Sequence, residues 1–273
     1  MLRLLFATGL WALSLHAQAA PRIDPVPGGI AEVLLAPANA PRPQALLAGR
    51  PTLVIPGPHG WRALVGLPLD LPPGVRNLTV RLANGAERQL SFLVRPKDYP
   101  VQYLRFKDSS MVEPDPVTLA RIKAEQRTQD EVKTLWRDTP AVDLAFVAPA
   151  EGRRSSRFGL RRVMNDQPRA PHRGLDLALA TGTPVRSPAA GVVTHVGDFF
   201  FNGKTVFVDH GQGLITMVCH LDQVAVAAGQ EVGRGENLGR SGSSGRATGP
   251  HLHWTVFLNG TAVDPELFLP PTR

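Results

Sequence analysis

Two short motifs in the C-terminal half of the chain combine histidine with aspartate or with a second histidine. The first runs from His172 to Asp176, and the second is His251-Leu252-His253. Side chains alternate along an extended strand, so residues an even number of positions apart project to the same face. We therefore expect each motif to place its two polar side chains on one face of a strand.

The residue types of these motifs match the ligand set of a catalytic zinc ion. Such an ion is held by three histidine or carboxylate ligands and keeps a fourth position open, whereas a structural zinc ion takes four protein ligands, often cysteines. The chain has one cysteine, Cys219, which is too few for a structural site. Together the motifs predict a catalytic zinc site built from histidine, aspartate and histidine on β-strands.

Short apolar runs around the motifs predict the strands that position them. Glycine and proline, with 26 residues each, favour strands joined by turns over a helical bundle. Alternation predicts that Leu252 and Trp254 face the core, and Asn202-Gly203 has the composition of a hairpin turn. Strands are expected at residues 174–179, Pro184–Arg186, Gly191–Val196, Thr205–Val208, Leu214–His220 and His251–Leu258.

The first half of the chain has similar apolar runs but no cluster of chemically active side chains. It predicts a small β-sandwich-like domain over residues 20–108, with a hairpin turn at Asn84-Gly85. The one histidine of residues 20–108, His59, is interpreted as a loop residue, and the domain as a spacer or binding module. Strands are expected at Ile30–Ala36, Thr52–Ile55, Trp61–Leu67, Leu78–Leu82, Leu90–Val94 and Val101–Phe106.

A helical linker is predicted between the two halves, within residues 109–142. Asp115 has the residue type of an N-cap and Pro116 that of the first helical position, and a polar segment continues to Arg137. Pro140 ends this segment. Residues 143–273 are then expected to form the second, antiparallel β domain.

The first residues of the chain have the layout of an export signal, which we assign to residues 1–19. Arg3 is followed by an apolar run from Leu4 to Leu15 and by the small residues Ala17-Gln18-Ala19. The apolar run is shorter than the roughly 20 residues that span a bilayer. We expect an exported protein, periplasmic or secreted, without a transmembrane segment after signal removal.

The net charge of +7 indicates an anionic partner. A dense lysine and arginine stripe with interleaved aromatic residues is lacking, so cell-envelope polymers are favoured over nucleic acid. The densest basic stretch, from Arg153 to Arg162, is interpreted as a solvated face without an assigned role. The content of 43% hydrophobic and 19% charged residues excludes a disordered chain.

An ordered series of further motifs accompanies the two histidine motifs. Because of this series of motifs, residues 145–273 resemble the M23 family of zinc metallopeptidases, the lysostaphin-type or LytM domain. The motifs are Ser156-Arg157-Phe158-Gly159 with Arg161, His172 to Asp176, Gly191-Val192-Val193, Asp209-His210-Gly211, His220-Leu221, Gly242 to Gly249 and Gly249-Pro250-His251-Leu252-His253.

The resemblance implies a zinc endopeptidase that cleaves peptide bonds in the cross-links or stem peptides of peptidoglycan. It implies one Zn²⁺ per chain with His172, Asp176 and His253 as ligands. His220 and His251 match two further active-site histidines of the family. One of them could accept a proton from water while the other, protonated, stabilises the tetrahedral intermediate, and the sequence leaves their order open.

Alternative interpretations remain open from the sequence. A non-catalytic LytM-type envelope protein that binds peptidoglycan or activates wall amidases is the main one, because Val218 stands where family members usually carry tyrosine. A lipoyl or biotin carrier domain is disfavoured, because Lys204 lacks flanking methionines. A further hypothesis is that the N-terminal domain and linker helix cover the zinc groove and keep the enzyme latent.

Four other features receive minor assignments. We expect His210 to be structural, His195 to be an ordinary strand residue, and Cys219 to be buried on the side opposite His220. The glycine-rich residues 239–249 are interpreted as a wall of a substrate groove, since the lysine of a phosphate-binding loop is absent.

Overall fold

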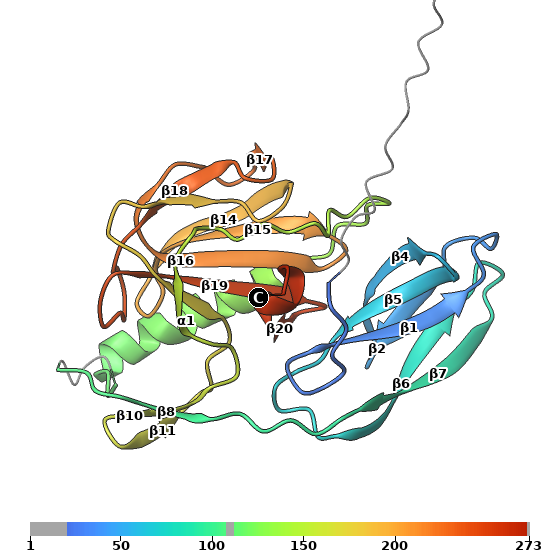
Figure 1. Ribbon diagram of the computed structural model, residues 1–273, viewed down its shortest axis with the longest axis horizontal. Helices are drawn as coiled ribbons and strands as arrows, with labels where there is room; N and C mark the ends of the chain where they lie inside the picture. The colour runs from blue at the N-terminus through green and yellow to red at the C-terminus, as the bar shows by residue number, and fades with distance from the viewer. Residues whose placement is uncertain (1–20, 108–111, 272–273) are drawn as a thin grey trace, which may run out of the picture.

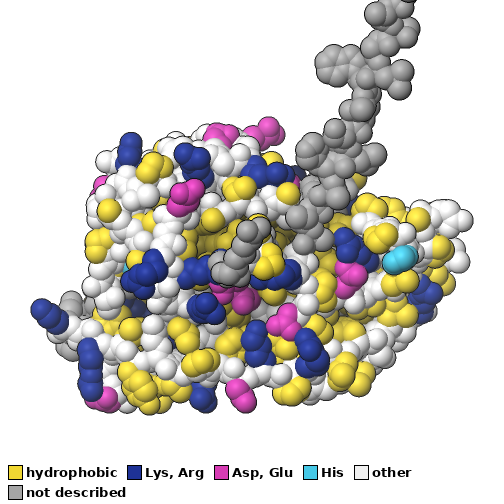
Figure 2. Space-filling model, viewed as in Figure 1, with side chains coloured by type: hydrophobic (Ala, Val, Ile, Leu, Met, Phe, Trp, Pro, Cys, Tyr) yellow, Lys and Arg dark blue, Asp and Glu magenta, His cyan; other side chains and the backbone are white. Residues whose placement is uncertain are grey.

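A computed structural model describes residues 21–107 and 112–271 and confirms a mainly β protein (Figure 1). The expected export signal lies outside the described residues. Within the described part of the chain, no helix is both long and apolar enough to cross a bilayer. On the face shown in Figure 2, Lys and Arg side chains lie scattered among acidic and apolar ones.

The N-terminal region is a sandwich of two small antiparallel sheets. Alternating apolar residues such as Val33, Val65 and Val80 fill the space between the sheets, as expected for strands with one buried face. The strands β2 and β3 were not predicted, because segments of four and two residues are too short to show an alternating pattern. The first sheet has the order β1-β5-β4, with β1 at Ile30–Ala36, β4 at Leu53–Gly57 and β5 at Gly60–Gly66. The second has the order β3-β2-β6-β7, with β2 at Gln44–Leu47, β3 at Arg50–Pro51, β6 at Gly74–Arg81 and β7 at Glu87–Val94.

The next strand, β8 (Val101–Leu104), leaves the sandwich and pairs with residues about sixty positions later in the chain. It lies parallel to β10 (Arg161–Met164), which forms a hairpin with β11 (Gln167–Arg169). This small sheet stands beside the C-terminal domain, so β8 is positioned to form part of a wall there.

One α-helix, α1 (Pro116–Lys133), follows β8. As predicted, Asp115 caps it, with its carboxylate accepting from the N–H groups of Val117 and Thr118, and Pro116 begins the first turn. The helix ends four residues before Arg137. It packs on the C-terminal sheet through buried Val132.

The C-terminal domain is built on one large, predominantly antiparallel sheet. Its main path has the order β17-β14-β15-β16-β19-β12-β9, β18 pairs with β13 and β16, and β20 pairs with β19. The strands are β9 (Arg153–Ser156), β12 (Leu175–Ala178), β13 (Pro184–Arg186), β14 (Gly191–Phe199), β15 (Gly203–Gly211), β16 (Leu214–Val224), β17 (Glu231–Val232), β18 (Asn237–Ser241), β19 (His251–Leu258) and β20 (Thr261–Val263), followed by a 3-10 helix at Pro265–Phe268.

One face of this sheet shares its core with the sandwich. Leu252 and Trp254 of β19 point into this core, as alternation predicts, and Ile30 and Leu64 of the sandwich belong to the same cluster of buried side chains. Asn259 strengthens the junction, because its side-chain oxygen accepts from the N–H of Gly66 at 2.7 Å and its amide donates to the Gly66 carbonyl at 3.1 Å. The sandwich is therefore fixed on the C-terminal sheet by apolar packing and by hydrogen bonds.

Candidate active site

The two histidine motifs meet at the paired strands β12 and β19. Asp176 and His253 are directly opposite each other in the antiparallel ladder. His172 lies in the loop before β12, and its backbone N–H donates to the Leu160 carbonyl at 2.9 Å while its carbonyl accepts from Gly159 at 2.8 Å. The loop therefore brings His172 to the strand pair, although His172 itself is not part of a strand.

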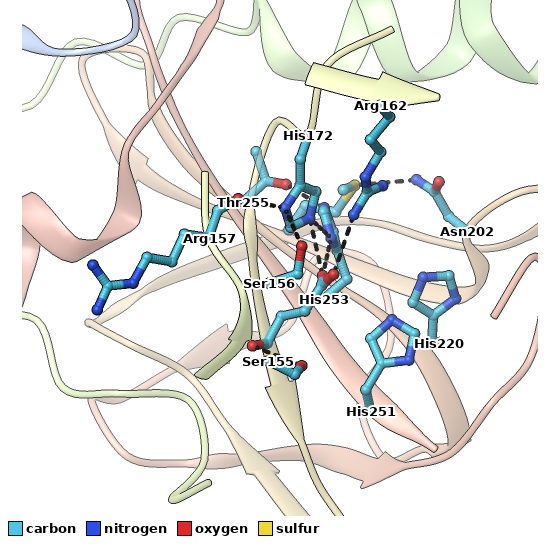
Figure 3. A network of polar contacts seen from close by, with 12 residues as sticks. Ser155, Ser156, Arg157, Arg162, His172, Asn202, His220, His251, His253 and Thr255 are labelled. Carbon is cyan, nitrogen blue, oxygen red and sulfur yellow. Dashed lines mark hydrogen bonds and ion pairs between the residues drawn. The ribbon is translucent and has the colours of Figure 1, made fainter. Parts of the chain in front are cut away.

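Three potential ligand atoms converge at this point. His172 Nε2 lies 3.0 Å from Asp176 Oδ1 and 3.0 Å from His253 Nδ1, and the last two atoms are 2.7 Å apart. These residues form the group of potential ligands that can hold a metal ion in the described chain. Figure 3 shows His172 and His253 directed toward one another.

Outer hydrogen bonds orient the two imidazoles. Nδ1 of His172 donates to the Arg157 carbonyl at 2.8 Å, which leaves Nε2 of the neutral ring with a free lone pair. Nε2 of His253 lies 2.9 Å from the Thr255 hydroxyl, which can accept its proton and leave Nδ1 as the ligand atom. Partners of this kind fix the ring orientation of metal-binding histidines.

Burial controls the charge of this group. His172 is 1% exposed, and burial lowers the pKa of its imidazole to about 4, so the ring is neutral at pH 7. Burial alone would raise the pKa of Asp176, but its contacts with His172 and His253 outweigh this effect and hold the pKa well below its usual range. Two neutral imidazoles and one carboxylate are the protonation states that a zinc ion requires. The residues present therefore fit zinc.

Gly174 makes the close approach of the two motifs sterically feasible. A Cβ atom at this position would lie 2.6 Å from the Cε1 and Nε2 atoms of His253 and 2.6 Å from the carbonyl oxygen of Trp254. The glycine between His172 and Asp176 is therefore needed so that the loop can pass against the histidine of β19.

His220 and His251 form a second pair of rings beside the first group (Figure 3). Their ring centroids are 4.6 Å apart, and the His220 ring is 6.1 Å from that of His253. Nδ1 of His220 donates to the Ser244 carbonyl and Nδ1 of His251 to the Gly249 carbonyl, each at 2.8 Å. Because a carbonyl only accepts, each neutral ring keeps an unprotonated Nε2. Burial, followed by repulsion from His253 and His251, lowers the pKa of His220 to about 3.

A β-bulge places His220 at the site. Between flanking pairs of β15 and β16, one residue of β15 lies opposite two residues of β16, Cys219 and His220. His220 has φ +62°, a strained conformation for a residue other than glycine. Beyond the bulge, Leu221 packs in the same core as Val218, three residues earlier, which regular alternation would not allow.

The bulge corrects the expectation for Cys219. Cys219 is buried, but it pairs directly with His253 and therefore lies on the same sheet face, not on the opposite one. The expectation was wrong because it assumed regular alternation through His220. Val218 is 1% exposed within the core shared with the sandwich, so its side chain is directed away from the candidate site.

A cleft of about 320 Å³ opens over both groups of residues. Strand β8 and the residues after it form one wall, and the loop before β19 contributes residues 246 and 248–250 to the lining, as expected for the glycine-rich stretch. Among the described residues, neither the sandwich nor α1 contributes to the lining. The wall residues from the β8 segment are Gln102, Leu104 and Phe106.

The other three histidines of the described residues lie elsewhere. His210 is buried, with Nδ1 donating to the Ala190 carbonyl at 2.8 Å and Nε2 next to the Thr216 hydroxyl at 2.9 Å, and burial lowers its pKa to about 4. His195 stacks on Phe199. His59 is an exposed turn residue. None of these three lines the cleft.

Sequence reasoning missed several polar residues around the site, among them Arg162, Thr255 and Arg246. Arg162 donates to Oδ2 of Asp176 at 3.2 Å, although the basic stretch that contains it was interpreted as solvated. Thr255 contacts His253, and Arg246 lines the cleft. The even spacing of His253 and Thr255 along β19 could have indicated the contact between these two residues. Arg162 and Arg246 reach the site through pairing with β8 and through loop geometry, for which the sequence carries no local signal.

Comparisons with known proteins agree with this architecture. Residues 170–265 match Peptidase family M23, and residues 24–97 match the Peptidase family M23 N-terminal domain. Over 120 residues the chain is 41% identical to peptidoglycan DD-endopeptidase ShyA of Vibrio cholerae, which covers 44% of this chain and 28% of ShyA. Over 101 residues it is 43% identical to DD-carboxypeptidase/endopeptidase Mpg of Neisseria meningitidis, which covers 37% of this chain and 23% of Mpg. The chain thus matches less than a third of the length of either relative.

A solved structure matches nearly the whole chain. The crystal structure of a protein from Pseudomonas aeruginosa assigned to peptidase M23 is 42% identical, with a TM-score of 0.77, and the match covers 90% of this chain and 95% of the other. Such coverage includes both the sandwich and the C-terminal sheet with its histidine pairs. On these grounds the chain belongs to peptidase family M23.

Proposed function

We propose that this protein is an exported zinc endopeptidase that hydrolyses peptide bonds in peptidoglycan cross-links or stem peptides. One Zn²⁺ per chain would be held by His172, Asp176 and His253. The convergence of three ligand atoms, with a buried neutral imidazole and an ionised carboxylate among them, carries this proposal. Sites with three protein ligands leave a coordination position open, which is typical of catalytic zinc.

The chemistry divides between the metal group and the second pair of histidines. A zinc ion at this site would act as a Lewis acid that polarises the scissile carbonyl and makes water acidic enough to attack near neutral pH. Nδ1 of each ring of His220 and His251 donates to a backbone carbonyl, so in the neutral ring Nε2 is the atom that can accept the proton of the attacking water. The imidazolium formed can then stabilise negative charge or return the proton to the leaving nitrogen.

The relatives support the choice of substrate. ShyA is named a peptidoglycan DD-endopeptidase and Mpg a DD-carboxypeptidase/endopeptidase. All five proposed site residues lie within residues 170–265, which match Peptidase family M23. The signal-like residues 1–19 support export to the compartment where peptidoglycan lies.

Metal analysis combined with hydrolysis of purified peptidoglycan tests the proposal. We expect about one zinc per chain in protein that starts at Ala20, release of peptide fragments, loss of both with a chelator, and recovery on return of zinc. The same assays on His253→Ala should show neither zinc nor hydrolysis. Zinc without hydrolysis of any peptidoglycan would contradict the enzyme and favour a binding or activating protein, and absence of zinc would contradict the metal site.

A further inference from the structure

Strand β8 presents a polar side chain to the cleft. Val101 and Tyr103 are exposed on one face of the strand, whereas Gln102 and Leu104, on the other face, line the cleft. Gln102 pairs with Arg162 across the parallel strands β8 and β10. It therefore stands in the cleft wall, although it lies outside residues 170–265, which match Peptidase family M23.

Two hydrogen bonds fix the side-chain amide of Gln102. Its oxygen, Oε1, accepts from Nε of Arg162 at 3.4 Å and from the hydroxyl of Ser156 at 3.3 Å. Because a guanidinium only donates, the amide atom that faces Arg162 must be the oxygen, and Nε2 forms the other end of the amide. Within the described residues Nε2 has no acceptor, and it is not one of the fully buried polar atoms without a partner. Nε2 is therefore an accessible donor in the cleft wall.

This donor lies next to the group of proposed zinc ligands. Arg162, which donates to Gln102, also donates to Oδ2 of Asp176 at 3.2 Å. Ser156 Oγ lies 3.2 Å from Nδ1 of His172. A ligand held by Nε2 of Gln102 would therefore lie near the place where the proposed function puts the metal.

A peptide in the cleft needs donors of this kind. Its main-chain carbonyls lose water on binding, and a buried carbonyl without a partner costs free energy. The amide of Asn202, which also lines the cleft, already donates to Gln129 at 3.0 Å. Nε2 of Gln102 is not engaged in this way, and because its amide is already fixed, it loses little side-chain entropy on binding.

We propose that Gln102 is a substrate-binding residue that donates from Nε2 to a main-chain carbonyl of the peptide in the cleft. Through Gln102, strand β8 would contribute to substrate binding as well as forming a wall. The inference rests on the proposed function, because it assigns a substrate contact at the same site.

Binding of a non-cleavable peptide tests this inference without the need for turnover. The probe is an acetylated tripeptide amide that ends in two D-alanines, with a ketomethylene group in place of the amide between them. It keeps main-chain carbonyls but carries no charge, so long-range electrostatic effects of a substitution act weakly on it. Calorimetric titration of the zinc-loaded full chain measures the dissociation constant of the probe.

Two substitutions distinguish a substrate contact from a purely supporting role. Gln102→Glu keeps an oxygen for Arg162 and Ser156 but replaces the donor by a carboxylate oxygen, so probe binding should weaken about ten-fold or more. Gln102→Met removes both ends of the amide and should weaken binding about three- to ten-fold, the range of one neutral hydrogen bond. Gln89→Glu, the same change at an exposed residue of the sandwich, should bind the probe as the wild type does.

Zinc content and melting temperature show whether each variant is folded. Wild-type affinity in folded Gln102→Glu would overturn the inference and leave Gln102 as a support for Arg162. If Gln102→Glu does not fold, Gln102→Met decides. Wild-type affinity in Gln102→Met would overturn the inference, and weaker probe binding at unchanged zinc content would support it.

The outcomes separate this inference from the proposed function. A wild-type protein that hydrolyses peptidoglycan but binds the probe independently of Gln102, or not at all, would overturn only the substrate contact. Probe binding that depends on Gln102 in a protein that hydrolyses nothing would support the contact and contradict only the enzyme.

Discussion

The two halves of one sheet face have opposite characters. Toward one end, α1 covers the face, and Phe207, Ile215 and Met217 pack there with Val132 of the helix. Toward the other end, the β8 segment stands over the face and leaves the cleft that His251 and His253 line. Strand β19 runs through both halves, with Phe257 packed on the helix side and Thr255 at the boundary.

This comparison shows that alternation selects the face of a strand but not the surroundings of that face. Along β19 the same face carries histidine, histidine, threonine and phenylalanine in turn. A helix fills its half with apolar contacts, whereas the β8 segment leaves polar side chains in contact with solvent and with each other. The element that covers each half decides whether it becomes core or active site.

The largest expected effect is in the cleft half. Asp176→Ala removes the one carboxylate of the proposed ligand set, so we expect loss of bound zinc and a fall in hydrolysis of about a thousand-fold or more. His195→Ala removes a histidine next to the helix-covered half and serves as the matched control, with zinc content unchanged. Elemental analysis and fragment release measure both. Full zinc occupancy in Asp176→Ala would show that the metal lies elsewhere.

The second-largest expected effect is a loss of stability in the half of the sheet face that α1 covers. Phe207 is fully buried, and Phe207→Ala should lower the free energy of unfolding by about 3–5 kcal/mol through the lost burial and the cavity. Zinc stoichiometry and activity per folded molecule should stay at the wild-type value, because Phe207 does not line the cleft. Chemical denaturation and metal analysis test this. Loss of zinc in the folded variant would show that the two halves are coupled.

A smaller effect is expected at the boundary. Thr255→Val keeps the shape of the side chain but removes the hydroxyl beside Nε2 of His253, so zinc affinity should fall about 10–100-fold. Thr255→Ser retains the hydroxyl and should bind zinc as the wild type does. Competition with a zinc chelator measures the affinity. Equal affinities in Thr255→Val and Thr255→Ser would contradict a role of the hydroxyl in orienting His253.

The smallest effect concerns the helix itself. Val132→Ala should lower the free energy of unfolding by about 1 kcal/mol, because the lost burial is partly offset by the better helix propensity of alanine. Val117→Ala, at a residue that is 81% exposed in the same helix, should not destabilise the protein. Thermal unfolding compares the two variants. Equal melting temperatures would show that Val132 contributes little to docking of the helix.

Sequence reasoning was most accurate where the signal is local. The expected strand at His251–Leu258 agrees in both bounds, and Leu252 and Trp254 face the core as alternation predicts. Asp115 caps a helix that begins at Pro116. It was less accurate for β2, β3, β9, β10, β11, β17, β18 and β20, which are short or rich in polar residues and lack a clear period of two.

The sequence by itself determined the mainly β architecture and the helix start, because capping and side-chain alternation are properties of neighbouring residues. The residues of the two histidine groups were predicted from the resemblance of an ordered series of motifs to a known family. The tertiary structure alone decided which other residues lie around the two histidine groups. A bulge turns His220 into the cleft against regular alternation, and the pairing of β8 with β10 brings Gln102 beside Arg162. Arg162 and Arg246 then line the cleft through contacts between segments distant in sequence. Such contacts depend on strand register and loop path over the whole fold, which no local pattern encodes.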